Sequence, residues 1–273
     1  MAILLFIAFY ARKHIQSTRY RANIHAINSY KEVAHLFNTC DKNTLITFDV
    51  DDTLITGRDA LARNFWNHTW FKVQAFFKYP ELIYRDTYEW ATSIMFDQAE
   101  RFVIEPFVID FIQKLQTQGC IILGLTLMDT GSWGIINSMP AWRVKMLHEF
   151  GIDFNSINSK HRFHDAIFTT IPIYRDTYPG IYSNIICTNQ QSKGLVLGTF
   201  LDYFKITLRT IISFDDNKQA LESIADMCAQ RGILFTGYHY KGAELVAPKW
   251  DTNRALRQVD YIMQKGKWMS DYE

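Results

Sequence analysis

Three carboxylates crowd together directly after a short apolar segment. The segment Leu45 to Phe48 is followed by Asp49, Asp51 and Asp52. A buried carboxylate without a partner costs several kcal/mol, and like charges packed together raise that cost. Such an arrangement needs a cation, or well-placed backbone N–H groups, to compensate the charge.

A second acidic pair ends another apolar segment in the same way. Asp215 and Asp216 follow residues 210–214, which read "TIISF". If the two segments are neighbouring strands, their acidic ends can share one divalent cation. Mg²⁺ suits a site of oxygen ligands, because it takes one or two carboxylates and keeps several waters that a phosphate oxygen can replace. We therefore expect a Mg²⁺ site that also admits a phosphate group.

The spacing within the first cluster predicts two different chemical roles. Asp49, at the end of its strand, can turn its carboxylate into the crevice and act as a nucleophile. Asp51 lies where the chain is expected to turn, and its carboxylate can then reach a leaving-group oxygen. There it would act as a general acid and later deprotonate water. The hydroxyl of Thr53 is expected to cap the turn.

The elements that must position these residues alternate between short apolar strands and helices. This alternation predicts a parallel sheet that is covered on both faces, with its ligand site beyond the carboxyl ends of the strands. The predicted strands are 45–48, 120–126, 185–188, 210–214 and 233–240. The predicted helices are 106–119, 142–151, 193–204 and 217–232.

The predicted fold class is α/β, a Rossmann-like three-layer core with a central parallel sheet and a small helical cap inserted after the first strand. The core is assigned to residues 44–57 and 104–245, and the cap to residues 58–103, which are helical in pattern and rich in aromatic residues. A helical pair that extends the core is the alternative for the insertion. Residues 1–43 are expected to form an N-terminal helical segment, and 246–273 a peripheral C-terminal extension.

Four short stretches resemble the motifs of the haloacid dehalogenase (HAD) superfamily, in the order in which that superfamily has them. "FDVDDTL" (48–54) is similar to the first motif in its phosphatase form, Asp-x-Asp-x-Thr. Thr126, which ends "ILGLT", matches the second motif, and Lys193 in "NQQSKG" matches the third. "IISFDD" (211–216) fits the acidic fourth motif. The chain looks closest to a little-characterised bacterial branch of this superfamily.

The resemblance implies a Mg²⁺-dependent phosphomonoester phosphatase that forms an aspartyl-phosphate on Asp49, with Asp51 as the acid and base. Thr126 would hydrogen-bond the phosphoryl group, and Lys193 would pair with the nucleophile and the phosphoryl oxygens. By position Asp216 is the expected side-chain metal ligand beside Asp49, with Asp215 as its neighbour. Asp51 would add its backbone carbonyl to the metal.

The sequence departs from the pattern of this branch after the second motif. A small residue and an arginine are expected there, whereas this chain has Leu127, Met128 and Asp129. An extra acid could repel an anionic substrate. A catalytically weak binding or effector module therefore stays open as an alternative, as does a phosphotransferase. A dehalogenase is disfavoured, because such enzymes lack the second aspartate that Asp51 provides.

The composition of the chain limits the classes of molecule that it is expected to bind. The charge is balanced, with 29 Lys plus Arg against 28 Asp plus Glu, so the chain has no strong overall positive potential that would attract nucleic acid. A phosphorylated small molecule or phosphoprotein is the expected substrate. Membrane contact is expected only through the apolar run Ala2 to Tyr10, which is too short to span a bilayer. This run is either a packed helix or an export signal, so a bacterial protein of the cytoplasm and an exported one are both compatible with it.

Overall fold

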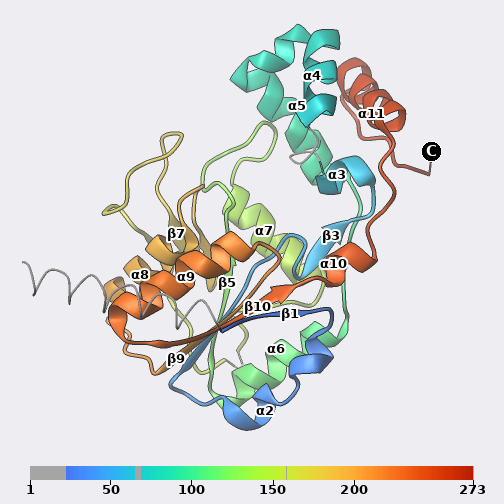
Figure 1. Ribbon diagram of the computed structural model, residues 1–273. Helices are drawn as coiled ribbons and strands as arrows, with labels where there is room; N and C mark the ends of the chain where they lie inside the picture. Colours follow the sequence, from blue (N-terminus) through green and yellow to red (C-terminus); the bar gives the residue numbers. More distant parts are fainter. Residues whose placement is uncertain (1–22, 65–68, 158, 273) are drawn as a thin grey trace, which may run out of the picture.

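The computed structural model describes residues 23–64, 69–157 and 159–272. Helices cover both faces of a large central sheet, and a group of helices stands above one edge of it (Figure 1). The apolar run Ala2 to Tyr10 lies outside the described residues. Within them, no helix combines the length and the apolar character needed to cross a membrane.

Each predicted strand and helix of the core is present, with ends within a few residues of the predicted ones, whereas three shorter strands of the central sheet, β1, β6 and β7, were not predicted. The strands are β1 Ile24–Ile27, β2 Thr44–Phe48, β3 Ile55–Gly57, β4 Arg101–Val103, β5 Ile121–Thr126, β6 Ala166–Ile167, β7 Gly180–Tyr182, β8 Ile185–Cys187, β9 Thr210–Asp215 and β10 Leu234–Tyr240. The helices are η1 Tyr30–Val33, α2 Leu36–Thr39, α3 Ala60–Asn64, α4 Thr69–Lys78, η2 Pro80–Ile83, α5 Arg85–Gln98, α6 Phe107–Gln118, α7 Met139–Glu149, α8 Lys193–Tyr203, α9 Lys218–Arg231, α10 Gly242–Leu245 and α11 Thr252–Lys265.

The described residues form one eight-stranded sheet in the order β1-β10-β9-β2-β5-β8-β7-β6. Neighbours from β1 to β8 in this order are parallel, and only β7 and β6 run antiparallel to their partners. A separate antiparallel pair, β3 with β4, stands at the base of the cap. The α/β class and the Rossmann-like three-layer core are therefore confirmed.

Alternate side chains of the central strands enter two apolar layers, one on each face of the sheet. In β2, Phe48 packs with α6 on one face, whereas Leu45 packs with α8 and α9 on the other. Buried side chains on both faces explain why these strands read as continuous apolar runs rather than as alternating patterns. Phe48 stacks on Phe214 of β9 with ring centroids 4.9 Å apart, which fixes the register between these two strands.

The predicted helical character of residues 1–43 is wrong for the part around Ile24. Residues Ile24–Ile27 form β1, a parallel edge strand beside β10, and β2 is consequently the second strand in chain order. Tyr30, in the short helix η1 that follows, is fully buried and stacks on Tyr240 of β10. The N-terminal segment thus closes one side of the core.

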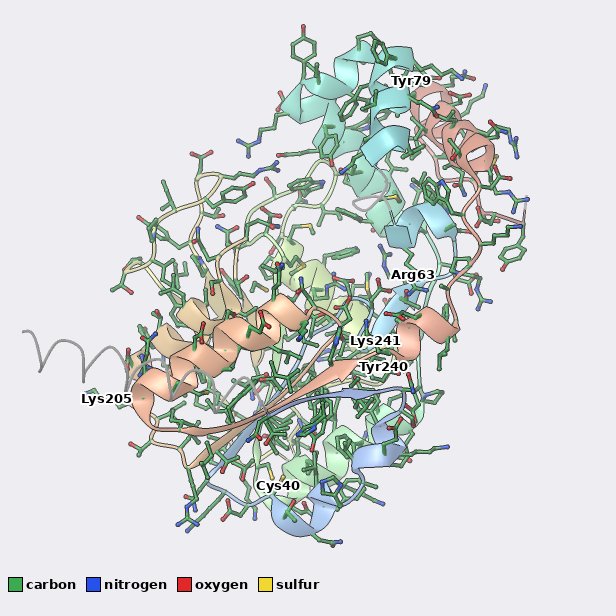
Figure 2. All side chains as sticks on the ribbon, viewed as in Figure 1. Cys40, Arg63, Tyr79, Lys205, Tyr240 and Lys241 are labelled. Carbon is green, nitrogen blue, oxygen red and sulfur yellow. The ribbon has the colours of Figure 1, made fainter. Side chains whose placement is uncertain are left out.

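The inserted helices α3, α4 and α5 share an apolar core of their own with α11 (Figure 1). Val259 and Ile262 of α11 pack there against Leu61 and Ile94. Tyr79 lies where the inserted helices meet α11 (Figure 2), and its hydroxyl donates to Asp260 at 2.9 Å. The segment expected to be peripheral is therefore an integral part of this unit, which we call the cap (residues 58–103 and 252–272).

A loop of the core, residues 127–138, anchors the cap through α5. The indole N–H of Trp133 donates to the Thr92 hydroxyl at 2.7 Å, and the backbone N–H of Ile135 donates to the Ser93 hydroxyl at 3.0 Å. Gly134, with φ of +53°, lies between them, and a Cβ at that position would come within 2.3 Å of the Glu89 carbonyl oxygen. Only glycine permits this close approach of the loop to α5.

Candidate active site

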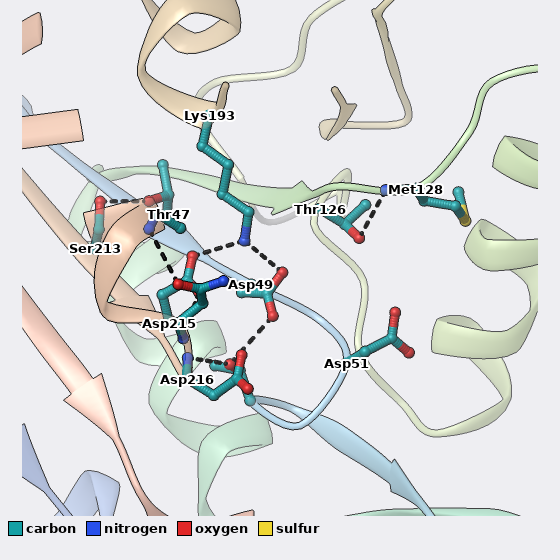
Figure 3. A network of polar contacts seen from close by, with 12 residues as sticks. Thr47, Asp49, Asp51, Thr126, Met128, Lys193, Ser213, Asp215 and Asp216 are labelled. Atoms are coloured by element: carbon teal, nitrogen blue, oxygen red, sulfur yellow. Dashed lines mark hydrogen bonds and ion pairs between the residues drawn. The ribbon is translucent and has the colours of Figure 1, made fainter. Parts of the chain in front are cut away.

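The predicted site residues gather at the carboxyl ends of three adjacent strands (Figure 3). Asp49 follows β2, Asp215 ends β9 and Thr126 ends β5. The backbone N–H of Asp49 donates to the carbonyl of Phe214 at 2.9 Å, which holds the two acidic strand ends side by side. The register of the sheet therefore brings together residues that lie far apart in the sequence.

Lys193 joins the two acidic strand ends. Its Nζ lies 2.6 Å from Asp49 Oδ1 and 2.6 Å from Asp215 Oδ2, and all three side chains are buried. Two carboxylates and one ammonium leave a net negative charge in this buried group before Asp216 is counted. The single lysine therefore does not balance the acidic cluster by itself.

The start of α8 places Lys193 in this position. Lys193 is the first residue of α8, and Gly194 follows it against α9. A Cβ on Gly194 would come within 2.0 Å of the Ser223 carbonyl oxygen, and its N–H donates to the Ser223 hydroxyl at 3.1 Å. The absence of a side chain at Gly194 lets α8 approach α9 closely, which directs Lys193 into the crevice.

A divalent cation fits between three of the carboxylates. One oxygen from each of Asp49, Asp215 and Asp216 lies within 4.8 Å of the other two. Among the described residues this is the group of acidic, histidine or cysteine side chains with metal-binding geometry. Carboxylate oxygens are the donors that Mg²⁺ prefers, so the donor set agrees with the expected metal. The carboxylate of Asp51 does not belong to this group.

Thr53 does more than cap the turn. Its hydroxyl donates to Asp49 Oδ2 at 3.3 Å and accepts from the backbone N–H of Asp216 at 3.1 Å. Asp52, between Asp51 and Thr53, has φ of +57°, a left-handed conformation that aspartate tolerates better than most residues do. This turn lets Thr53 return to the site and connect both acidic strand ends.

The electrostatics of the site favour protons or a metal on the carboxylates. Burial raises the pKa of Asp216 to about 8, and the charges of Asp49 and Asp215 add to the rise. Burial also raises the pKa of Asp49 to about 7, although Lys193 acts in the opposite direction. Burial alone would lower the pKa of Lys193, but its two ion pairs outweigh this effect and raise it. The cluster thus holds more negative charge than its own lysine compensates.

Thr126 is buried at the end of β5, and its hydroxyl accepts from the backbone N–H of Met128 at 3.4 Å.

Asp129, the acidic residue that departs from the pattern of the resembled branch, accepts a hydrogen bond from Gln190 at 3.0 Å. Burial raises the pKa of Asp129, which lowers its tendency to carry charge. Two features thus reduce the expected repulsion of an anionic substrate by this residue.

Asp51 is engaged by a residue that the sequence did not single out. Nη1 and Nη2 of Arg143, on α7, donate to its two carboxylate oxygens at 2.9 and 2.7 Å. Figure 3 shows Asp51 apart from the metal-binding group, with its carboxylate turned away from Asp49. The pair spans 92 residues of sequence, so no local pattern could have revealed it.

A family model described as "Protein of unknown function (DUF2608)" matches residues 23–273. The chain belongs to the DUF2608 family. The matched range contains every site residue named above, together with the cap and α11. An uncharacterised protein of Rickettsia prowazekii (strain Madrid E) is 24% identical over 245 residues, which cover 88% of this chain and 84% of that protein. An uncharacterised protein of Rickettsia bellii (strain RML369-C) is 21% identical over 229 residues, covering 81% and 76%. No solved structure matches the chain.

The acidic cluster is expected to make the stability of this DUF2608 protein depend on pH. The raised pKa values of Asp49 and Asp216 mean that the folded protein binds protons more tightly than the unfolded chain does. The resulting stability is complete below about pH 4 and is lost as the pH rises through about 7 to 8. Without metal, the contribution of these carboxylates to the melting temperature should therefore fall between about pH 4 and pH 8, and saturating Mg²⁺ should raise the melting temperature more at pH 8.5 than at pH 6.

Thermal melts with Mg²⁺ or with chelator, at both pH values, measure this effect. Asp216→Asn should reduce both the fall and the Mg²⁺ response. Asp110→Asn is the matched control, because Asp110 is an exposed aspartate of α6. Equal stabilisation by Mg²⁺ at both pH values would contradict the assignment of Asp49 and Asp216 as carboxylates that bind either protons or the metal.

Proposed function

We propose that this protein is a Mg²⁺-dependent phosphomonoester phosphatase that works through an aspartyl-phosphate on Asp49. The observation that carries the proposal is the buried arrangement of Lys193 between Asp49 and Asp215, with Asp216 close enough for one cation to bridge the carboxylates. A structural ion pair would need one carboxylate for one lysine. Three carboxylates around one ammonium instead support a site that binds a metal and an anion.

Asp49 attacks phosphorus in line with the leaving oxygen, and the bond from phosphorus to that oxygen breaks. Lys193 neutralises the nucleophile and the phosphoryl oxygens, and the hydroxyl of Thr126 hydrogen-bonds the phosphoryl group. Asp49 and Asp216, with Asp215 beside them, would hold the divalent cation, which would supply positive charge for the phosphoryl oxygens. Thr53 keeps the nucleophile oriented through its hydroxyl.

Asp51, once it has left Arg143 and taken up a proton from solvent, protonates the leaving oxygen and then takes a proton from the water that hydrolyses the aspartyl-phosphate. Its side chain is 58% exposed, so the surrounding packing leaves room for another rotamer. In the described state both of its oxygens accept hydrogen bonds from Arg143, and the ion pair has to open before Asp51 can reach the leaving oxygen.

Hydrolysis of p-nitrophenyl phosphate tests this proposal. We expect release of p-nitrophenol that requires Mg²⁺ and stops with chelator, between about pH 5 and pH 8. Stoichiometric inorganic phosphate supports a hydrolase, whereas p-nitrophenol in excess over phosphate, when an alcohol is added, supports a phosphotransferase.

The closed pair of Asp51 and Arg143 favours one other candidate, a catalytically weak binding module whose acid is held away from the site. In that case no chelator-sensitive release is expected at any pH in this range. The same assay therefore separates the two candidates.

A further inference from the structure

Arg143 is a buried cation whose partner is mostly exposed. Its side chain is 5% exposed, whereas that of Asp51 is 58% exposed. Within the described part of the chain, Asp51 is the carboxylate in ion-pair contact with Arg143, and Nε of Arg143 is buried without a hydrogen-bond partner. The guanidinium thus has its two Nη atoms on Asp51 and one buried N–H, at Nε, without a partner.

A second guanidinium makes this region more strongly positive. Arg101, from β4 at the base of the cap, lies with Cζ 5.4 Å from the ring centroid of Trp142, and Arg143 lies 5.1 Å from the same centroid. Burial lowers the pKa of Arg101 to about 10, and the charge of Arg143 adds to this effect. Nη1 of Arg101 donates to the carbonyls of Phe96 and Ala99, which ties Arg101 to the end of α5.

Opening the pair of Asp51 and Arg143 therefore creates an electrostatic problem. If Asp51 swings toward a leaving oxygen, Arg143 stays buried beside Arg101 without an anion, which is strongly destabilising. The fork of Arg143 matches the paired oxygens of a carboxylate or a phosphate. An anionic group that arrives with the substrate can take the place of Asp51 and release it for proton transfer.

We propose that the substrate is a phosphomonoester whose leaving group carries a second anionic group, which Arg143 binds. This inference rests on the proposed phosphatase function and names its substrate class. Arg143 is then the residue that determines specificity, and Asp51 is free for catalysis only when such a substrate is bound. Esters with a neutral leaving group leave the pair closed and react slowly.

The test compares kcat/KM for esters that differ in the charge of the leaving group. The first pair is 3-phosphoglycerate with glycerol 3-phosphate, and the second is 4-carboxyphenyl phosphate with 4-carbamoylphenyl phosphate, which have nearly the same shape. Propane-1,3-diol bisphosphate distinguishes a second phosphate from a carboxylate. We expect at least a tenfold preference for the acidic member of at least one pair, or for the bisphosphate over glycerol 3-phosphate.

Arg143→Gln should remove this preference, mainly by lowering kcat/KM for the acidic ester, and Arg143→Lys should keep part of it. Lys145→Gln is the control, because Lys145 lies on the same helix with a side chain that is 79% exposed. Thermal melts show whether each variant is folded. If Arg143→Gln does not fold, Arg143→Lys is used to test whether the preference for acidic esters decreases.

A preference below threefold for every acidic ester would overturn the inference. So would an equal loss for acidic and neutral esters in Arg143→Gln, since Arg143 would then only position Asp51. Either result, with p-nitrophenyl phosphate still hydrolysed in a Mg²⁺-dependent way, leaves the proposed function standing. Absence of any Mg²⁺-dependent hydrolysis removes both.

Discussion

Asp49→Asn is expected to abolish phosphate release, a loss of about 10⁴-fold or more in kcat, with the fold kept intact. The amide of asparagine has nearly the same shape as the carboxylate, but it cannot attack phosphorus. Lys193 keeps its ion pair with Asp215 at 2.6 Å, so the buried ammonium still has a counter-charge. The loss therefore concerns the chemistry and not the packing.

Hydrolysis of p-nitrophenyl phosphate and thermal melts, measured on the same preparations, separate these effects. The melting temperature without metal should not fall, because the variant removes one charge from a crowded acidic group. Asp110→Asn, at an exposed position of α6, controls for the replacement of a carboxylate by an amide. Turnover within tenfold of the unmodified protein would remove Asp49 from the role of nucleophile.

Lys193→Met is expected to destroy activity and to destabilise the protein. The side chain of Lys193 is 2% exposed, and its removal leaves Asp49 and Asp215 buried without a cation. Breaking a buried ion pair from one side costs roughly 3–5 kcal/mol. With about 2–4 °C per kcal/mol for a domain of this size, the melting temperature should drop by on the order of 10 °C.

The size of this destabilisation should depend on whether protons or a metal ion can compensate the negative charge of the two carboxylates. Lowering the pH protonates them, and Mg²⁺ bridges them, so both conditions should recover part of the lost melting temperature. Lys145→Met, at an exposed position of α7, is the control and should melt like the unmodified protein. If Lys193→Met is as stable as this control at pH 8 without metal, the carboxylates are not held as a charged group.

The core could be predicted because its strands are short and apolar on both faces, and few folds other than a parallel sheet covered by helices on both sides produce this pattern. A polar residue ends β5 and β9 and directly follows β2, and parallel strands bring such positions to the same edge of the sheet. The proximity of Asp49 to Asp215 followed from this rule, whereas Thr126 and Lys193 were assigned to the site through the resemblance to the HAD motifs.

Other features depend on contacts that no local pattern encodes. β1 is only four residues long, and it is a strand because the edge of β10 offers hydrogen bonds. Arg143 lies in an ordinary helical pattern, and its role comes from Asp51 on a distant turn. The amphipathic α11 could cover any apolar face, and the sequence does not say that this face belongs to the cap.

The joint between Asp59 and the segment after α11 has a consequence for synthesis of the chain. Asp59 accepts from the backbone N–H of Asp271, 212 residues later, and from the indole of Trp268. A ribosome therefore delivers Asp49 and the whole sheet well before the residues that complete the apolar core of the cap. Until α11 emerges, the inserted helices α3, α4 and α5 lack the side chains of α11 that cover their apolar face.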